Sequence, residues 1–229
     1  MQVFSFRALS VAAGVLVASA SAQALTLTIP TSFLVADSTQ KFSEVALDAF
    51  GAANIQITPL GNAVAVSGTT DSYRLPVTSI SISGFKIAGG AAVGSALEIA
   101  RTAPRGTPSA GQKVAVTLAN FVINYNTKQV LADVTRLRGS TTRQMPIYNF
   151  NVATPLGLKY RFPLTVTGLE VLDKLTLTPE TRQAFIDSLE LKTFEVGALD
   201  SVDTFGSLTQ DIKLQFRKAV STKPYTPAP

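Results

Sequence analysis

The sequence contains no cysteine, histidine or tryptophan. Without cysteine the chain forms no disulfide, so the hydrophobic core must stabilise the fold alone. The absence of both histidine and cysteine removes the usual ligands of zinc, copper and iron–sulfur centres. It also excludes Ser-His-Asp and Cys-His nucleophilic catalysis. We therefore predict a protein with no metal site, no cofactor and no catalytic residue, that is, a protein that is not an enzyme.

Charged residues are also scarce. They make up 15% of the chain, against about 25% in an average globular domain, and the mean hydropathy is +0.26. Such a surface must consist largely of Thr, Ser, Asn, Gln and Ala, which suits an extracellular protein or one that buries faces against partners. The net charge is +5, but the basic residues are dispersed and are not interleaved with aromatic residues. We therefore expect no nucleic-acid partner.

The N-terminus has the order of a secretory signal peptide. Arg7 is the only charge before the apolar run 8–18, and small residues follow. The run is too short for a membrane span, so export with cleavage is favoured over an uncleaved anchor. Residues 22–24 fit the cleavage site and place the mature start at Leu25, with 20–22 as a second site. We predict bacterial Sec-type export to the periplasm, the cell surface or the medium.

The strongest structural pattern lies in residues 112–135. Apolar and polar residues alternate over 114–118, slip by one position at Ala119-Asn120, and alternate again from Phe121. A slip of one residue is typical of a β-bulge. A polar turn at 126–128 separates this run from a second alternating run. The pattern predicts a long β-hairpin with a bulge in its first strand.

Two segments have the pattern of helices. From about Thr39 to Phe50, apolar residues recur at the spacing of a helix with one buried face. Thr178 precedes a proline and a glutamate, which predicts a helix start there and a helix as far as about Leu189. Short alternating runs fill most of the remaining chain. We predict an all-β, or β-dominated, fold: a β-sandwich with two short peripheral helices. A closed barrel, including the outer-membrane type, is the alternative.

We expect the chain to divide into three parts. These are a signal peptide (1–24), a single β-rich domain (25–220) and a Pro-rich disordered tail (221–229).

One short pattern occurs twice. Tyr73–Thr78 reads YRLPVT and Tyr160–Thr165 reads YRFPLT, with four identities in six positions. The two copies are either related sheet units or a coincidence between strands. Proline within a strand is typical of an edge or a bulge. Both segments are therefore candidate edges, with Tyr73 and Tyr160 as candidate interaction residues.

A set of arginines flanks the predicted hairpin at the end opposite its turn. They either form a basic rim for an anionic partner, such as an acidic polysaccharide or lipid head groups, or serve solubility alone. The set consists of Arg101, Arg105, Arg136, Arg138 and Arg143.

Acidic residues offer two weaker candidates. Glu195, Asp200 and Asp203 lie close in sequence but lack the alternating Asp and the Gly of a calcium loop, so a solvated loop is favoured. Glu170 and Asp173 are more typical of an exposed turn than of a glycosidase pair. Carboxylate pairs are set by spacing in three dimensions, so a carboxylate-dependent extracellular hydrolase remains an alternative.

The order of Tyr73–Val77, Val116–Ile123 and Leu131–Val134 resembles part of the HtaA-like domains. Those domains are secreted β-rich modules of bacterial haem uptake. The resemblance covers about residues 60–134. The chain departs from them in its Arg101–Gln112 segment, which looks like an insertion, and in lacking a histidine to support a haem ligand. The resemblance implies a secreted, non-enzymatic β module and assigns no binding residue.

Together these patterns predict a secreted, non-enzymatic structural or interaction protein of the cell surface, a matrix or a filament. It would act through β-strand edges and polar loops, either by self-association or by docking onto another β-rich surface. One alternative is a binding protein for an apolar or haem-like ligand. The other is the carboxylate-dependent hydrolase.

Overall fold

The computed structural model describes residues 26–30, 35–83, 86–161, 165–213 and 220–227. The expected signal peptide and the expected mature start at Leu25 lie outside the described residues. So does Pro163, in the second candidate edge.

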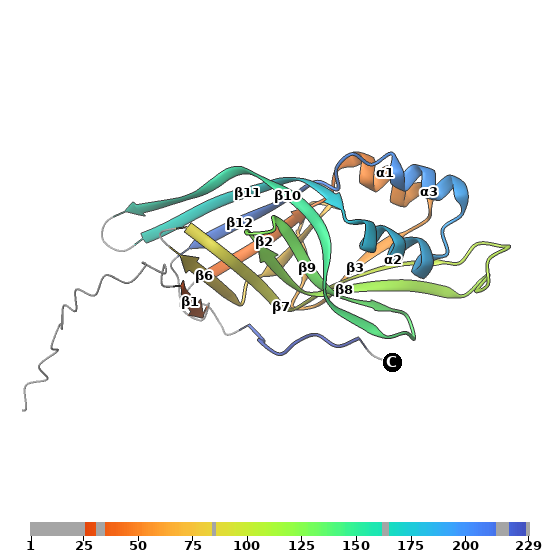
Figure 1. Cartoon of the computed structure of the whole chain (residues 1–229), viewed down its shortest axis with the longest axis horizontal. Helices are drawn as coiled ribbons and strands as arrows, with labels where there is room; N and C mark the ends of the chain where they lie inside the picture. The colour runs from red at the N-terminus through yellow and green to blue at the C-terminus, as the bar shows by residue number, and fades with distance from the viewer. Residues whose placement is uncertain (1–25, 31–34, 84–85, 162–164, 214–219, 228–229) are drawn as a thin grey trace, which may run out of the picture.

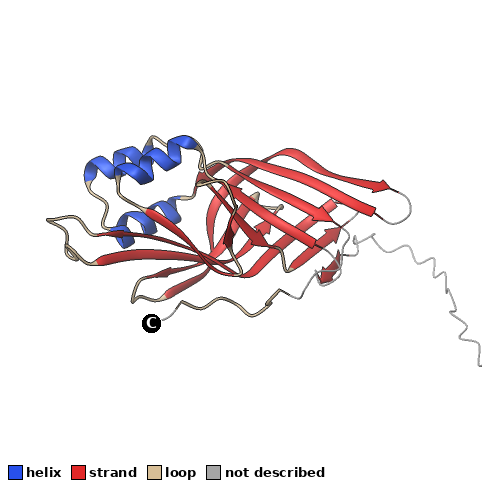
Figure 2. Ribbon diagram, turned by 180° about the vertical axis from the view of Figure 1, so that it is seen from behind, coloured by secondary structure: helices blue, strands red, loops and turns tan. Residues whose placement is uncertain are grey.

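The described residues form one antiparallel sheet of twelve strands, which curls nearly into a barrel (Figures 1 and 2). Its strands are β1 (Thr26–Pro30), β2 (Val35–Lys41), β3 (Gln56–Gly61), β4 (Val64–Ala65), β5 (Ser72–Pro76), β6 (Ser79–Ser83), β7 (Lys86–Thr102), β8 (Lys113–Asn124), β9 (Gln129–Arg136), β10 (Thr141–Arg161), β11 (Thr165–Leu177) and β12 (Ser207–Lys213). The strand order is β1-β6-β7-β8-β9-β10-β11-β12-β2-β5-β4, with β3 beside β7. The prediction of a β-dominated fold is confirmed.

The sheet closes at the junction between β5 and β6. The N–H of Val77 donates to the carbonyl of Ala36 on β2 (2.8 Å), whereas the N–H of Thr78 donates to the carbonyl of Ala91 on β7 (2.7 Å). Residues 72–83 therefore pair first with β2 and then with β7. Because Pro76 has no N–H to donate, it suits this corner. The two layers expected of a sandwich are thus opposite walls of one curled sheet.

The bulge predicted in the main hairpin is present in β8. Asn120 has a φ of 54°, and the register with both neighbouring strands shifts there. Val116 and Leu118 before the bulge are buried, and Phe121 and Ile123 after it line the interior of the sheet. The extra residue keeps the apolar side chains of both halves of the strand inside.

The first predicted helix begins later than expected, whereas the second lies where the sequence predicted it. Residues 35–41 form β2, and α1 spans Glu44–Ala52 with Ser43 as its cap. Alternate residues of β2 face the interior, and this burial overrides the helical spacing that begins in the same segment. The second helix, α2 (Pro179–Leu189), begins after Thr178 as predicted.

A third helix, α3 (Thr193–Asp200), was not predicted. The carboxylate of Glu195 accepts a hydrogen bond from the N–H of Lys192 (2.7 Å), which caps its first turn. All three helices gather at one end of the sheet (Figure 2).

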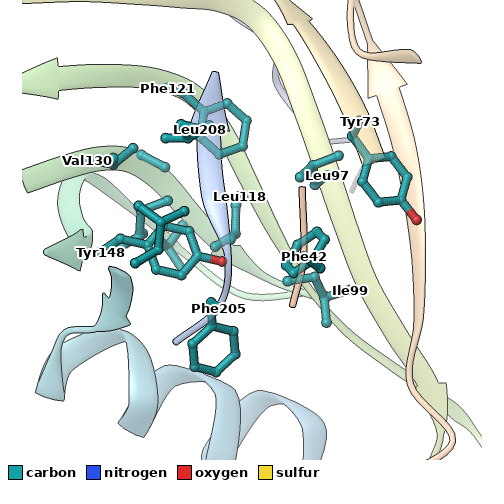
Figure 3. Packing of buried hydrophobic residues seen from close by; sticks show 14 of the residues in the cluster. Phe42, Tyr73, Leu97, Ile99, Leu118, Phe121, Val130, Tyr148, Phe205 and Leu208 are labelled. Atoms are coloured by element: carbon teal, nitrogen blue, oxygen red, sulfur yellow. The ribbon is translucent and has the colours of Figure 1, made fainter. Parts of the chain in front are cut away.

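Aromatic rings connect the sheet interior to this helical end. Phe205 lies between Phe50 of α1 and Tyr148 of β10, with ring centroids 6.0 and 5.9 Å apart. Figure 3 shows Tyr148 and Phe205 together with Leu118 and Leu208 in this region. The core is therefore continuous from the sheet to the helices, and no disulfide is needed to join them.

The C-terminal segment lies against the outside of the sheet. Its composition predicts a disordered or extended tail, and residues 220–227 run extended beneath β7 and β8 (Figure 1). Asn62 donates to the carbonyl of Ser221 (2.7 Å), and Asn120 binds Tyr225. Side-chain amides distant in sequence thus satisfy the main chain of this segment.

The buried face of β8 is the most sensitive part of this fold. Val116 is fully buried, so Val116→Asp should lower the free energy of unfolding by about 4 kcal/mol or more. Thr135→Asp, at a half-exposed position on the neighbouring strand, should cost about 1 kcal/mol or less. Urea denaturation followed by circular dichroism measures both. Equal losses would mean that β8 does not bury Val116.

Candidate interaction surfaces

The first candidate edge lies inside the sheet. β5 pairs with β2 on one side and with β4 on the other. Tyr73 is buried, and its hydroxyl donates to the carbonyl of Ile57 (3.3 Å). Tyr73–Val77 is therefore not an exposed edge, and Tyr73 packs in the core. The proline that suggested an edge instead marks the corner where the sheet closes.

The second candidate edge lies on a strand with one open side. β10 pairs with β9 as far as Asn149, and the N–H of Phe150 still donates to the carbonyl of Lys128 (3.0 Å). Beyond these residues its pairing within the described chain is with β11. Tyr160 pairs through its main chain with Val166. Figure 1 shows β10 and β11 extending together as a ribbon away from the helical end.

The open part of β10 is solvated at its start. Residues 151–155 are exposed without interruption. The register with β11 shifts within this stretch, between Val152 and Thr154, and Leu156 beyond it packs against buried residues. Val152 is 39% exposed and Leu169 on the paired strand is 49% exposed. Pro155 and the exposed Lys159 are the residues of this stretch that discourage strand pairing.

One of the five candidate arginines is buried and cannot belong to a surface rim. Arg101 donates to both carboxylate oxygens of Glu195 (2.7 and 3.0 Å) and to the carbonyls of Ala53 and Glu190 (both 3.0 Å). Its side chain is 1% exposed. These bonds tie β7 to α3 and to the residues that follow α1 and α2. The sequence did not show this partner because the two residues are 94 positions apart.

Two of the other arginines share a groove on the outside of the sheet. The groove has a volume of about 820 Å³, and its lining includes Thr117, Thr135, Arg136, Arg138, Thr141 and Tyr225. Arg136 also forms an ion pair with Asp187 of α2 (3.1 Å).

The remaining two arginines, Arg105 and Arg143, are exposed and do not line this groove. The predicted rim is therefore reduced to Arg136 and Arg138.

The interior of the sheet is nearly filled. Two small cavities, of about 20 and 10 Å³, lie among apolar side chains and the polar groups of Ser38, Gln40 and Gln210. A cavity of roughly 10–15 Å³ holds one water molecule, whereas pockets for small ligands have volumes of about 300–1,000 Å³. An apolar or haem-like ligand therefore does not fit inside this structure without rearrangement.

Three of the candidate carboxylates, Glu170, Glu195 and Asp200, are each bound to a different partner. Arg182 holds Asp200 through two hydrogen bonds, and this bond lowers the pKa of Asp200. Glu170 is buried and accepts a hydrogen bond from the hydroxyl of Tyr125. Burial raises the pKa of Glu170, although the bonds from Tyr125 and from the N–H of Leu156 oppose it.

Two members of the acidic cluster seen in the sequence bind different arginines. Glu195 binds Arg101, and Asp200 binds Arg182. Among the described residues no group of acidic side chains is arranged to hold a metal ion.

Comparisons with known proteins support a weak likeness. No protein-family model and no curated protein matches the sequence. The structure is similar to the crystal structure of the C-terminal domain of HtaA from Corynebacterium glutamicum, with 15% sequence identity and a TM-score of 0.46. The similarity covers 79% of this chain and 97% of that domain. The weak, partial HtaA-like resemblance predicted from the sequence is therefore confirmed. None of the described helices has the length and apolar character of a membrane-spanning helix.

Substitution of Arg101 tests whether this residue forms a buried ion pair with Glu195. Arg101→Met would leave the carboxylate of Glu195 buried and unpaired, and should lower the free energy of unfolding by about 3–5 kcal/mol. Arg105→Met, at an exposed position, should change it by less than about 0.5 kcal/mol. Urea denaturation measures both. The double variant Arg101→Met/Glu195→Met should be more stable than the single variant, and equal stability would contradict a buried pair.

The same pair predicts the direction of a pH effect. Burial raises the pKa of Glu195, but the bonds from Arg101 and Lys192 outweigh it, and the net pKa lies below the usual range. Its stabilising effect is present above the ordinary glutamate pKa and is lost as the pH falls through the lowered value. Wild-type stability should therefore decline in acid, and the double variant should lack this part of the decline.

Proposed function

We propose that this chain is an exported, non-enzymatic interaction protein that self-associates by strand addition along β10. The observation that carries the proposal is the open side of β10 beyond Phe150, where the described chain provides no second partner strand. Export is supported by the signal-peptide pattern of residues 1–24. The proposal agrees with the charge-poor composition, which leaves few lysines to guard the edge.

Strand addition follows from the chemistry of an open edge. Main-chain N–H and C=O groups on the open side of β10 can bind the main chain of another strand, except the N–H of Leu156, which donates to Glu170. The side chains of residues 151–155 are exposed, so an added strand could approach the main chain there. Val152 and Leu169 would supply apolar contacts that are now exposed to water. A second copy presents the same edge and can pair with it antiparallel.

The non-enzymatic part of the proposal rests on the side chains that are present. Histidine and cysteine are absent from the whole sequence. Asp200 and Glu195 are neutralised by arginines. Glu170 is buried, so a polymer substrate would have to open the sheet to reach it.

Charge placed beside the open edge should prevent association. Val152→Lys/Leu169→Lys removes two exposed apolar side chains and adds two positive charges per copy at and beside the proposed edge, so dimerisation should weaken at least about tenfold. Val64→Lys, at a residue of similar exposure (40%) on β4, is the matched control and should associate as the wild type does. Sedimentation velocity across a concentration series measures the association. A wild-type protein that stays monomeric at high concentration would refute the proposal.

A second candidate function is the binding of an anionic polymer in the groove that contains Arg136 and Arg138. The observation that favours it is the combination of these two cations with threonine hydroxyls and one tyrosine in a single groove. The groove also contains Glu98, whose charge is paired with Lys113. Such a set suits an acidic polysaccharide, which offers both carboxylates and hydroxyl groups.

This second function has its own test. Arg138→Gln should weaken retention on immobilised polygalacturonate several-fold and reduce the dependence of retention on salt, because one cation is removed from the groove. Arg143→Gln, at an exposed residue outside the groove, should have little effect. Equal effects of the two substitutions would assign the binding to net charge alone.

A further inference from the structure

The C-terminal segment occupies a groove on the outside of the sheet that is formed by Asn62, Asn120, Gly61 and Gly94. Asn120 contacts the segment as a neighbouring strand would. The N–H of Tyr225 donates to Oδ1 of Asn120 (2.8 Å), and Nδ2 of Asn120 donates to the carbonyl of Tyr225 (3.0 Å). One side-chain amide thus satisfies both main-chain groups of one residue, whatever that residue is.

The amide of Asn120 is held in place by the sheet itself. Its Oδ1 also accepts from the N–H of Gly94 (3.0 Å), and its Nδ2 also donates to Asp133 (2.8 Å). The N–H of Gln144 fixes Asp133 in turn (3.0 Å). Asn120 is 4% exposed. If the segment detached, these bonds would keep the amide oriented with one acceptor position and one N–H free. The site is preorganised for an extended main chain.

A second amide and two glycines complete the groove. Asn62 donates from Nδ2 to the carbonyls of Ser221 (2.7 Å) and Val93 (3.1 Å). A Cβ on Gly94 would lie 2.5 Å from Nδ2 of Asn62 and 2.9 Å from the carbonyl oxygen of Lys223. A Cβ on Gly61 would lie 2.1 Å from the carbonyl oxygen of Gly94 and 2.9 Å from the ring of Tyr225. Both glycines have positive φ, at 82° and 62°. The groove floor is therefore shaped to let a peptide approach closely.

The contacts indicate what the groove recognises. They go to main-chain atoms of the segment and to the ring of Tyr225, which is half-buried. Residues 221–224 are exposed. Recognition therefore requires an extended peptide with an aromatic residue at one position and tolerates variation elsewhere. Because so few contacts hold the segment, it can open locally without unfolding the sheet.

We propose that this groove is a peptide-binding site and that it accepts residues 221–227 of a second copy of this chain in place of its own. This mode of association is separate from β10 and does not depend on the proposed strand addition. The chain's own C-terminal segment competes with that of the second copy for the groove, and its effective concentration there is on the order of millimolar. Exchange is therefore favoured where copies are crowded together.

The experiment uses the full chain and a fluorescent peptide of residues 220–227. Tyr225→Gly in the protein weakens the segment bound in cis, and this variant should bind the peptide saturably in an anisotropy titration. The wild-type chain should bind the same peptide at least about tenfold more weakly, because its own segment occupies the groove. Failure of the Tyr225→Gly chain to bind at millimolar peptide, or equal binding by both chains, would overturn the proposal.

Two controls test the individual contacts. A peptide N-methylated at the Tyr225 amide leaves the protein unchanged, cannot donate to Asn120 and should bind the Tyr225→Gly chain at least about tenfold more weakly. The unmodified peptide should likewise bind more weakly when Asn62→Ala is added to the Tyr225→Gly chain. Binding that survives both changes would place the peptide elsewhere. Val152→Lys/Leu169→Lys introduced into the Tyr225→Gly chain should leave peptide binding unchanged, so failure of strand addition and failure of this proposal are distinguishable.

Discussion

The rest of the structure depends on the bulge at Asn120 in β8. A strand without it would turn either Val116 and Leu118 or Phe121 and Ile123 toward solvent, because the side-chain period of a strand is two. The bulge keeps both pairs inside. It also leaves the amide of Asn120 outside, where it binds the C-terminal segment. One local departure from regular pairing thus serves the core and creates the peptide groove.

The helical end depends on a different interaction. Arg101 binds Glu195 and two main-chain carbonyls beneath α1, α2 and α3. A buried ion pair adds little net stability compared with apolar packing, but it is costly to break. Its role is therefore to fix the position of the helices relative to the sheet. The aromatic contacts of Phe205 with Phe50 and Tyr148 pack the space between them.

Two of the three surfaces proposed for interaction, the open side of β10 and the groove at Asn120, recognise the main chain of a partner. The open side of β10 offers unpaired backbone groups, and the groove at Asn120 offers side-chain amides that imitate a strand. Neither needs charge, and the chain has little. The arginine groove is the exception. Of the five arginines considered from the sequence, Arg136 and Arg138 line it, whereas Arg101 is buried and Arg105 and Arg143 lie elsewhere on the surface.

Sequence periodicity alone determined the β-dominated class, the bulged hairpin and the helix after Thr178. These features follow from local rules, namely the alternation of apolar residues, the one-residue slip and the helix cap. The absence of cysteine and histidine likewise restricted the chemistry of the chain without any structure.

Only the tertiary structure decided which prolines mark edges, which arginines are exposed and where the C-terminal segment lies. Pro76 stands at the corner where the sheet closes, and Arg101 finds Glu195 94 residues away. Tyr225 meets Asn120 across 105 residues. These outcomes depend on which distant strands become neighbours, and a pattern confined to one segment carries no information about its partners in space.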